Sequence, residues 1–319
     1  MAVVSNLPSI KHLDEGDVVA LHVSGLVETM YRAKSEHNTL LVTERCNSNC
    51  LMCSQPPKDI DDIDRNLSII RRVIPLIPTE CKELGISGGE PTLLGAKLRE
   101  LIDDINLHLP FTHVHILTNG RRFAWDGYAC TMQGIRNVTF GIPLYSDYYK
   151  DHDYVVQADD AFNQTVIGIH NLARYSLDVE IRVVLHAITI PRLLSLSEFI
   201  YRNLPFVEHV AFMGMEHIGY APHNMDILDI DPVDYKDVLR DSTLYLADRG
   251  LNVSVYNLQL CVADEQIWEF CRLSISDWKR DYLDICDTCQ VKDQCTGFFS
   301  WNRQRPSRGV KPQQLCLEG

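Results

Sequence analysis

Short apolar runs alternate with longer amphipathic stretches along most of the chain after residue 37. The apolar runs are rich in β-branched residues and span residues 39–44, 83–88, 113–118, 137–144, 179–186 and 208–214. The stretches between them carry apolar residues near helical spacing, as in residues 65–77, 96–109, 163–175 and 193–204. Strands that are apolar on both faces and joined by helices are typical of parallel sheets and barrels. The pattern therefore predicts an α/β fold built from six βα units, a partial (β/α)6 barrel.

Polar motifs follow the predicted strands. Three cysteines between residues 46 and 53 follow the first strand, and Gly-Gly-Glu-Pro at 88–91 ends the second. Thr-Asn-Gly at 118–120 ends the third strand, and Tyr-Ser-Asp at 145–147 follows the fourth. Because parallel βα barrels carry their active sites at the carboxyl ends of the strands, we expect these motifs to meet at one site.

The segments on either side of this alternation differ from it. Residues 1–37 contain an apolar stretch that we expect to form a small β element packed against the barrel. From about residue 226 the alternation gives way to one helix-like stretch and a cysteine-rich tail. We therefore expect three parts: an N-terminal element at 1–37, a barrel at 38–225 and a small C-terminal domain at 226–319.

Composition and charge exclude several classes of protein. The 319 residues are 45% apolar and 23% charged, which is typical of a folded globular chain. A net charge of −13 argues against a surface that neutralises phosphates, so a nucleic acid is not an expected partner. No apolar run reaches membrane-spanning length, and the N-terminus lacks the pattern of a secretory signal. We expect a cytoplasmic protein without a membrane partner.

Eleven cysteines in such a chain call for metal binding or catalysis, since structural disulfides rarely persist under reducing conditions. Cys46, Cys50 and Cys53 follow one another with the spacing Cys-x3-Cys-x2-Cys. Three thiolates would leave one iron of a four-iron cluster open. A structural zinc site needs a fourth ligand, and the nearest histidine, His37, lies nine residues upstream. Structural zinc and unrelated thiols remain the alternatives.

With this cysteine loop after the first strand and Gly88 to Pro91 one βα unit later, the chain resembles the radical S-adenosylmethionine (SAM) superfamily. The resemblance implies a [4Fe–4S] cluster on the three cysteines, with an open iron that binds SAM. It further implies reductive cleavage of SAM to methionine and a 5′-deoxyadenosyl radical, with electrons from a reductant such as flavodoxin or ferredoxin.

The glycine motif is the next candidate part of the SAM site. Gly88 and Gly89 lack Cβ atoms, so the backbone there can approach a ligand closely. Glu90 can accept a charge-assisted hydrogen bond from the SAM ammonium group, and Pro91 completes the motif. The alternative is a tight turn from strand to helix, with Pro91 near the helix start.

The same resemblance implies three further SAM contacts. Asn119 would meet the ribose, and Arg182 would pair with the carboxylate of SAM. Met52 stands where the superfamily often has an aromatic residue that lies against the adenine, a place that a thioether can fill. A turn asparagine and a strand arginine are also common structural residues, so both readings stay open.

A second group of cysteines lies near the C-terminus. Its four proposed ligands are Cys261, Cys286, Cys289 and Cys295. The last three resemble part of the SPASM pattern, but Phe299 stands where that pattern has another cysteine. This departure favours the related twitch type of extension, with one auxiliary [4Fe–4S] cluster. Four thiolates equally suit zinc, so zinc stays open, and Cys271 or Cys316 can replace one ligand.

Five segments narrow the resemblance to the C-type maturases of the His-Xaa-Ser peptide system. They are residues 37–57, 85–94, 115–123, 212–221 and 274–279. The resemblance implies hydrogen abstraction from a ribosomally made precursor peptide, followed by cross-linking or oxidation, alongside a second radical SAM maturase. Two alternatives are radical chemistry on a small molecule or nucleoside in cofactor or modified-base biosynthesis, and a non-catalytic metal-stabilised binding protein. No side chain is assigned as an acid or base.

Overall fold

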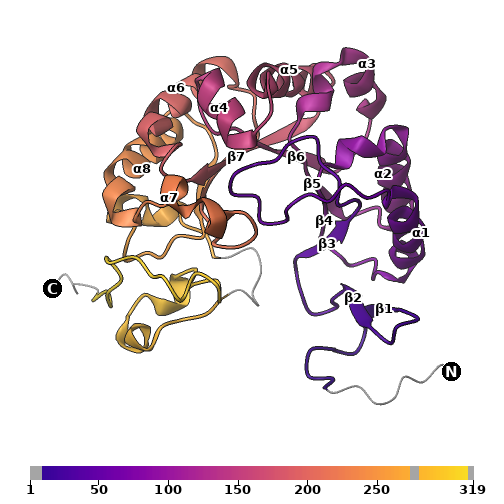
Figure 1. Ribbon diagram of the computed structural model, residues 1–319, viewed down its shortest axis with the longest axis horizontal. Coiled ribbons are helices and arrows are strands. Elements are labelled where there is room, and N and C mark those ends of the chain that lie inside the picture. Colours follow the sequence, from indigo (N-terminus) through magenta and orange to yellow (C-terminus); the bar gives the residue numbers. More distant parts are fainter. Residues whose placement is uncertain (1–8, 274–279, 315–319) are drawn as a thin grey trace.

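The computed structural model describes residues 9–273 and 280–314. Its centre is a seven-stranded sheet that curves into an arc, with the strands in chain order (Figure 1). Every neighbouring pair is parallel, which confirms the predicted α/β fold. The strands are β3 (Asn38–Leu41), β4 (Glu83–Ser87), β5 (His113–Leu117), β6 (Val138–Pro143), β7 (Asp178–Leu185), β8 (His209–Gly214) and β9 (Val253–Tyr256).

Helices cover the outer side of the curved sheet (Figure 1). The α-helices are α1 (Ile63–Val73), α2 (Ala96–His108), α3 (Asp126–Ala129), α4 (Tyr149–Val156), α5 (Ala161–Arg174), α6 (Leu193–Asn203), α7 (Met225–Leu228) and α8 (Pro232–Ala247). In α2, Leu98, Leu101, Ile102 and Ile105 are fully buried. Their i, i+3, i+4, i+7 spacing forms one apolar stripe that faces the sheet.

Alternation along the strands divides helix-facing from interior-facing side chains. In β5, Val114 and Ile116 are fully buried in the main core. His113, His115 and Leu117 lie between them and line cavities in the interior. The interior of the sheet therefore receives one set of alternating side chains, polar and apolar, and the other set packs in the layer between sheet and helices.

The seventh strand, β9, is the main addition to the predicted topology. It pairs with β8 from Val210 to Met213, and the preceding helix α8 packs on α6. The apolar runs predicted six strands, and residues 253–256 were expected to belong to the C-terminal part. In the described part of the chain short turns follow this strand in place of an α-helix, so the alternation of strand and helix that indicated the other strands is missing there. The sheet therefore extends beyond residue 225, and the three-part division otherwise remains a prediction.

The N-terminal segment forms a small β element. Strands β1 (Val18–Leu21) and β2 (Val27–Tyr31) make an antiparallel hairpin. Tyr31 is 4% exposed and belongs to the same core as Leu40 of β3. The Asn38 side chain accepts a hydrogen bond from the Arg32 backbone N–H (2.7 Å) and donates one to the Arg32 carbonyl (3.1 Å). These bonds fix the hairpin at the start of the sheet.

After β9 the chain forms short turns around a second, smaller core. Leu260, Val291 and Cys295 are buried there, with Trp268 and Tyr282 packed against them. Among the residues that the structure describes, no helix is both long and apolar enough to cross a lipid bilayer.

Candidate active site

Cys46, Cys50 and Cys53 line one cavity of about 290 Å³ at the carboxyl ends of the strands. Their loop crosses the opening of the curved sheet (Figure 1). The cavity wall also contains every other residue predicted for this site except Pro91. These residues are Met52, Gly88, Gly89, Glu90, Asn119 and Arg182. The structure thus gathers residues from four predicted motifs at one place.

Helix α4 supports the cysteine loop from one side. The backbone N–H groups of Asn49 and Leu51 donate to the carbonyls of Val156 (3.0 Å) and Val155 (2.9 Å). Met52 is 7% exposed and packs in a cluster with Val155 and Val156. Because two backbone bonds and one buried side chain act on neighbouring residues, this part of the loop has a fixed position.

The segment after β8 holds the same loop from the other side. Tyr220 donates its backbone N–H to the Cys53 carbonyl (2.9 Å), and the Asn224 side chain donates to the Leu51 carbonyl (2.7 Å). Gly219 has a φ of +66°, and a Cβ there would lie 2.2 Å from the Cys53 oxygen. Only glycine combines this left-handed backbone with so close an approach.

Gly88 and Gly89 are required by the backbone that leads into the cysteine loop. A Cβ on Gly88 would lie 2.5 Å from the Thr43 carbonyl oxygen, and one on Gly89 would lie 2.0 Å from the Arg45 oxygen. The N–H groups of Gly89 and Glu90 donate to the Thr43 and Arg45 carbonyls, each at 2.7 Å. The two glycines therefore join the motif to the cysteine loop, and their approach to a ligand remains a prediction.

Glu90 is completely buried and connects the ends of β4 and β5. Its Oε1 accepts hydrogen bonds from the Thr92 N–H (2.9 Å), the Thr92 hydroxyl (2.6 Å) and the Thr118 hydroxyl (2.6 Å). Its Oε2 accepts one from the Asn119 N–H (2.7 Å). Pro91 begins the short 3₁₀ turn Pro91–Leu94, and Glu90 caps that turn. The structure therefore contains the tight turn after the strand that was the alternative explanation of this motif. The hydrogen bond from the SAM ammonium group to Glu90 remains a prediction.

Asn119 and Arg121 bind the cysteine loop from the end of β5. The Asn119 amide donates to the Asn47 side chain (2.6 Å), and the Arg121 guanidinium donates to the Asn47 carbonyl (2.6 Å) and the Ser48 hydroxyl (3.1 Å). Arg121 was not among the predicted site residues, because no neighbouring residue in the chain indicates that it binds Asn47 and Ser48 far upstream. The ribose contact of Asn119 remains a prediction.

Arg182 belongs to a polar layer inside the barrel. Its guanidinium donates to Glu180 Oε1 (2.8 Å) and to the Met213 sulfur (3.2 Å). His115 and His209 also face Glu180, at 3.5 and 2.8 Å. Burial would raise the pKa of Glu180, but these hydrogen bonds and the Arg182 charge together lower it. Arg182 lines the cavity as predicted, and its pairing with SAM remains a prediction.

Tyr145 is a cavity residue whose side chain sequence analysis did not assign. It is 6% exposed, follows β6, and packs beside Met52 in the same apolar cluster. Its ring lies 5.7 Å from that of His152 and 6.0 Å from that of His186. Burial, followed by the nearby thiols, raises the pKa of Tyr145 well above its usual value. It is therefore an uncharged wall of the cavity.

The three thiols suit a positively charged group that binds thiolates. Burial raises the pKa of Cys46 to about 11 and that of Cys50 to about 12, and the neighbouring cysteines contribute in the same direction. Burial also raises the pKa of Cys53. Iron or another cation would stabilise the thiolate forms that this environment otherwise disfavours.

The second cysteine group also comes together. Cys261, Cys286, Cys289 and Cys295 line one small, largely apolar cavity between the turn that follows β9 and the C-terminal segment. Burial raises the pKa of Cys261 and of Cys295. The Gln313 backbone N–H donates to the Cys289 sulfur (3.3 Å), a contact often made to metal-bound thiolates. The donor set therefore fits the predicted metal group.

Two further cysteines were predicted as substitutes in this second site. Cys271 lies beside the cavity, packed against Leu260 and Cys295, and its thiol donates to the Ile267 carbonyl (3.5 Å). Burial raises its pKa to about 12. Cys316 lies outside the described residues, as does the predicted family segment 274–279.

Within residues 9–273 and 280–314, no three His, Cys, Asp or Glu side chains form a group that could hold a single metal ion. The cysteines of an iron–sulfur cluster each bind a different iron atom, so this absence leaves both clusters untested.

The comparison with protein families decides the classification. The model of the radical SAM superfamily matches residues 40–199, which is half of the chain. The chain belongs to the radical SAM superfamily. This is a superfamily of enzymes with radical chemistry, whose members bind SAM at an iron–sulfur cluster. The match includes both the cysteine loop and the Gly88 to Pro91 motif. No curated protein sequence matches the chain.

Solved structures of radical SAM proteins share the fold. SuiB of Streptococcus suis bound to SAM superposes with a TM-score of 0.55 at 14% identity, covering 79% of this chain and 55% of SuiB. The structure of anSMEcpe with bound SAM and the Cp18Cys peptide superposes with a TM-score of 0.57 at 14% identity, covering 86% of this chain and 91% of anSMEcpe. The hydrogenase maturase HydG of Carboxydothermus hydrogenoformans superposes with a TM-score of 0.51 at 8% identity, covering 74% of this chain and 56% of HydG. The chain spans about half the length of SuiB.

Proposed function

We propose that this radical SAM protein modifies a ribosomally made peptide by hydrogen abstraction, with one [4Fe–4S] cluster on Cys46, Cys50 and Cys53 and an auxiliary cluster in the C-terminal region. The observation that carries the proposal is the single cavity in which the three cysteines meet the Gly88–Gly89–Glu90 motif. Three thiolates leave one iron free for SAM, and the cavity beside them has room for a ligand.

The chain's own residues would orient SAM and exclude water. When bound, the cluster supplies the electron that cleaves SAM into methionine and a 5′-deoxyadenosyl radical. Leu117, Tyr145 and Val184 give the cavity apolar walls that keep water from a reactive species. Arg182 places a cation in the same cavity, where it can pair with the carboxylate of SAM. Met52 offers a thioether surface for the adenine.

A twitch-type extension with one auxiliary cluster is the arrangement that we propose for the C-terminal region. Its support is the shared cavity of Cys261, Cys286, Cys289 and Cys295. Peptide substrates are supported by the fold neighbours, because SuiB is also known bound to its precursor peptide SuiA and anSMEcpe to a peptide. The segments that resemble C-type maturases point to a precursor with His-Xaa-Ser repeats.

Metal content and SAM cleavage test the core of this proposal. We expect the anaerobically reconstituted protein to hold about eight irons, and the triple variant Cys46→Ala/Cys50→Ala/Cys53→Ala to hold about four. With dithionite, the protein should release 5′-deoxyadenosine and the triple variant should not. Cys130→Ala is the control, because Cys130 is exposed and lies outside both cysteine cavities. Zinc in place of iron, with no SAM cleavage, would leave only a metal-stabilised binding protein.

The substrate class needs its own measurement. A synthetic peptide with His-Xaa-Ser repeats, incubated with protein, SAM and dithionite, should lose two hydrogen atoms as it is oxidised or cross-linked. Mass spectrometry would detect this loss. An unchanged peptide, together with active SAM cleavage, would redirect the search to small molecules and nucleosides.

A further inference from the structure

The C-terminal strap, residues 305–313, forms one wall of the second cysteine site. Val310 and Lys311 line the cavity that holds the four cysteines. The Gln313 N–H donates to the Cys289 sulfur (3.3 Å), and the Gln313 carbonyl accepts from the Gln290 N–H (3.0 Å). The strap thus donates a backbone hydrogen bond to one of the four predicted ligands and lines the cavity that holds all four.

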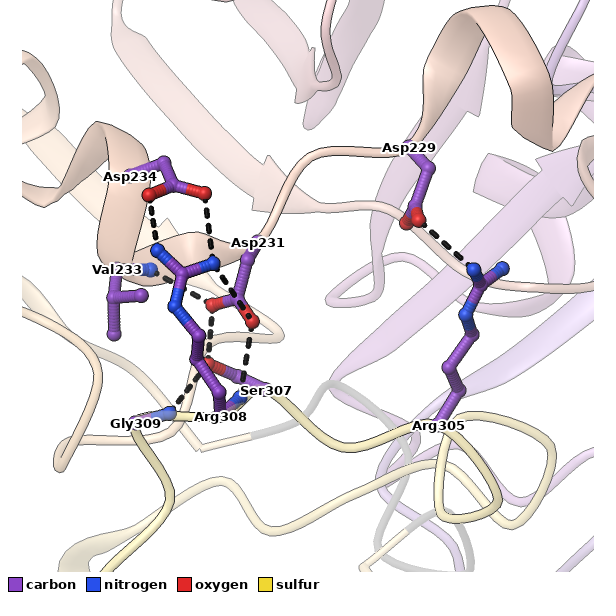
Figure 2. Close-up of polar contacts among 8 residues, drawn as sticks. All are labelled: Asp229, Asp231, Val233, Asp234, Arg305, Ser307, Arg308 and Gly309. Atoms are coloured by element: carbon purple, nitrogen blue, oxygen red, sulfur yellow. Dashed lines mark hydrogen bonds and ion pairs between the residues drawn. The ribbon is translucent and has the colours of Figure 1, made fainter.

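One carboxylate attaches the strap to the barrel. Asp231 Oδ1 accepts a hydrogen bond from the Ser307 hydroxyl (2.5 Å), and Oδ2 accepts one from the Arg308 backbone N–H (2.9 Å), as Figure 2 shows. Asp231 Oδ1 also accepts the Val233 N–H (3.1 Å), which makes it the N-cap of α8. Because α8 leads directly into β9, this contact connects the strap to the sheet.

Neighbouring contacts fix the strap in the same place. Arg308 reaches both carboxylate oxygens of Asp234 with its guanidinium, and Arg305 pairs with Asp229 at 3.1 Å (Figure 2). A Cβ on Gly309 would lie 2.2 Å from Val233 Cγ1, so the strap passes directly over the first turn of α8. Side-chain bonds and close packing therefore define one docked position.

We propose that Asp231 is a positioning residue for the second cysteine site: it holds the strap so that the Gln313 N–H reaches the Cys289 sulfur and water is kept out of the cavity. Hydrogen bonds to the sulfurs and solvent exposure are the main protein contributions to the reduction potential of an iron–sulfur cluster. The strap therefore affects both the potential and the retention of the metal. This inference rests on the auxiliary cluster of the proposed function.

Asp231→Asn separates the two tasks of this residue. The asparagine oxygen can still cap α8 at Val233, while its NH₂ group would face the Arg308 N–H and cannot accept that bond. Asp237→Asn is the matched control, because it removes the same charge from the same helix. Among the described residues, Asp237 forms its ion pair with Arg240 alone. A contribution through helix capping alone would leave both variants like the unmodified protein.

Iron release is the first readout. In the anaerobically reconstituted protein, we expect Asp231→Asn to lose the iron of the second site to a chelator about tenfold faster, with a shifted midpoint potential for that cluster. The irons assigned to Cys46, Cys50 and Cys53 should be retained as before, and Asp237→Asn should behave like the unmodified protein. Unchanged release and an unchanged potential in Asp231→Asn would overturn the inference.

Thiol alkylation gives a second readout that does not depend on which metal is bound. Iodoacetamide labelling of the full-length protein as isolated, followed by peptide mass spectrometry, should modify Cys289 about tenfold faster in Asp231→Asn. Labelling of the exposed Cys130 should not change. Equal labelling rates of Cys289 in Asp231→Asn and in the unmodified protein would contradict the proposed role of Asp231 in holding the strap. If Cys286→Ala/Cys289→Ala instead holds as much iron as the unmodified protein, the auxiliary cluster itself fails, whatever the labelling shows.

Discussion

At the scale of single residues, the first site depends on three glycines, where the backbone lies too close to its neighbours for a Cβ atom. Gly88 and Gly89 let two stretches of backbone meet where any Cβ would overlap a carbonyl oxygen. Gly219 does the same on the opposite side of the loop, against the Cys53 carbonyl. The position of the cysteine loop is thus defined by backbone contacts on both sides, before any metal binds.

Replacing one of these glycines should therefore be costly. We expect Gly89→Ala to lower the free energy of unfolding by roughly 3 kcal/mol, because the new methyl group would lie 2.0 Å from a backbone oxygen that cannot rotate away. Gly127→Ala is the matched control, since its Cβ would meet nothing within 4 Å. Urea unfolding monitored by fluorescence would compare them. Equal stability of the two variants would show that the backbone at Arg45 can move aside.

At the scale of elements, a buried carboxylate unites the ends of two parallel strands. Parallel neighbours hydrogen-bond along their length, but their connecting segments diverge where they leave the sheet. Glu90 joins these diverging ends, because it accepts bonds from Thr92 after β4 and from Thr118 and Asn119 after β5. The edge of the sheet that carries the site is therefore held together by side-chain bonds.

Glu90→Gln tests this connection. The amide oxygen can replace Oε1, but the NH₂ group would face the Asn119 N–H, which leaves a buried donor without an acceptor. We expect a loss of about 1–3 kcal/mol in the free energy of unfolding. Hydrogen exchange should also become faster at the Asn119 amide. Both measurements are made without SAM, so a contact between Glu90 and SAM does not contribute. Unchanged exchange at Asn119 would refute the connection.

At the scale of the whole molecule, buried histidines give the fold an acid-sensitive stability. Burial, with a smaller contribution from the Arg121 charge, lowers the pKa of His152 from 6.5 to about 3. Burial likewise lowers the pKa of His186 to about 4. Both side chains bind protons more readily in the unfolded chain. Stability is therefore greatest above pH 6.5 and falls as the pH decreases toward these lowered values.

The variant His152→Gln should show a flatter pH dependence. Each buried histidine contributes a slope of about 1 kcal/mol per pH unit below its unfolded pKa. Removing one of them should reduce the decline in the free energy of unfolding between pH 6.5 and 5. Urea unfolding at several pH values would measure both slopes, with His108→Gln, an exposed histidine, as the control. Parallel curves for His152→Gln and the unmodified protein would exclude His152 as a source of the acid sensitivity.

The sequence predicted those features of the whole molecule that consecutive residues carry. Six strands followed from apolar runs, and both cysteine groups followed from their spacing. The strand β9 did not, because short turns and no α-helix follow it in the described residues, so the strand–helix alternation ends before it. The connections of Glu90 and Arg121 were also out of reach, since each depends on partners that only the folded sheet brings near.

The C-terminal strap also implies an order of assembly. A chain emerges from its N-terminus during synthesis, so every strand from β3 to β9 precedes residues 305–313. The barrel and its first cysteine loop can thus be complete while the second site is still open on one side. That opening lasts until Ser307 and Arg308 reach Asp231. For the auxiliary cluster that we propose, delivery to the newly made chain would precede docking of the strap, whereas later delivery would have to displace the strap first.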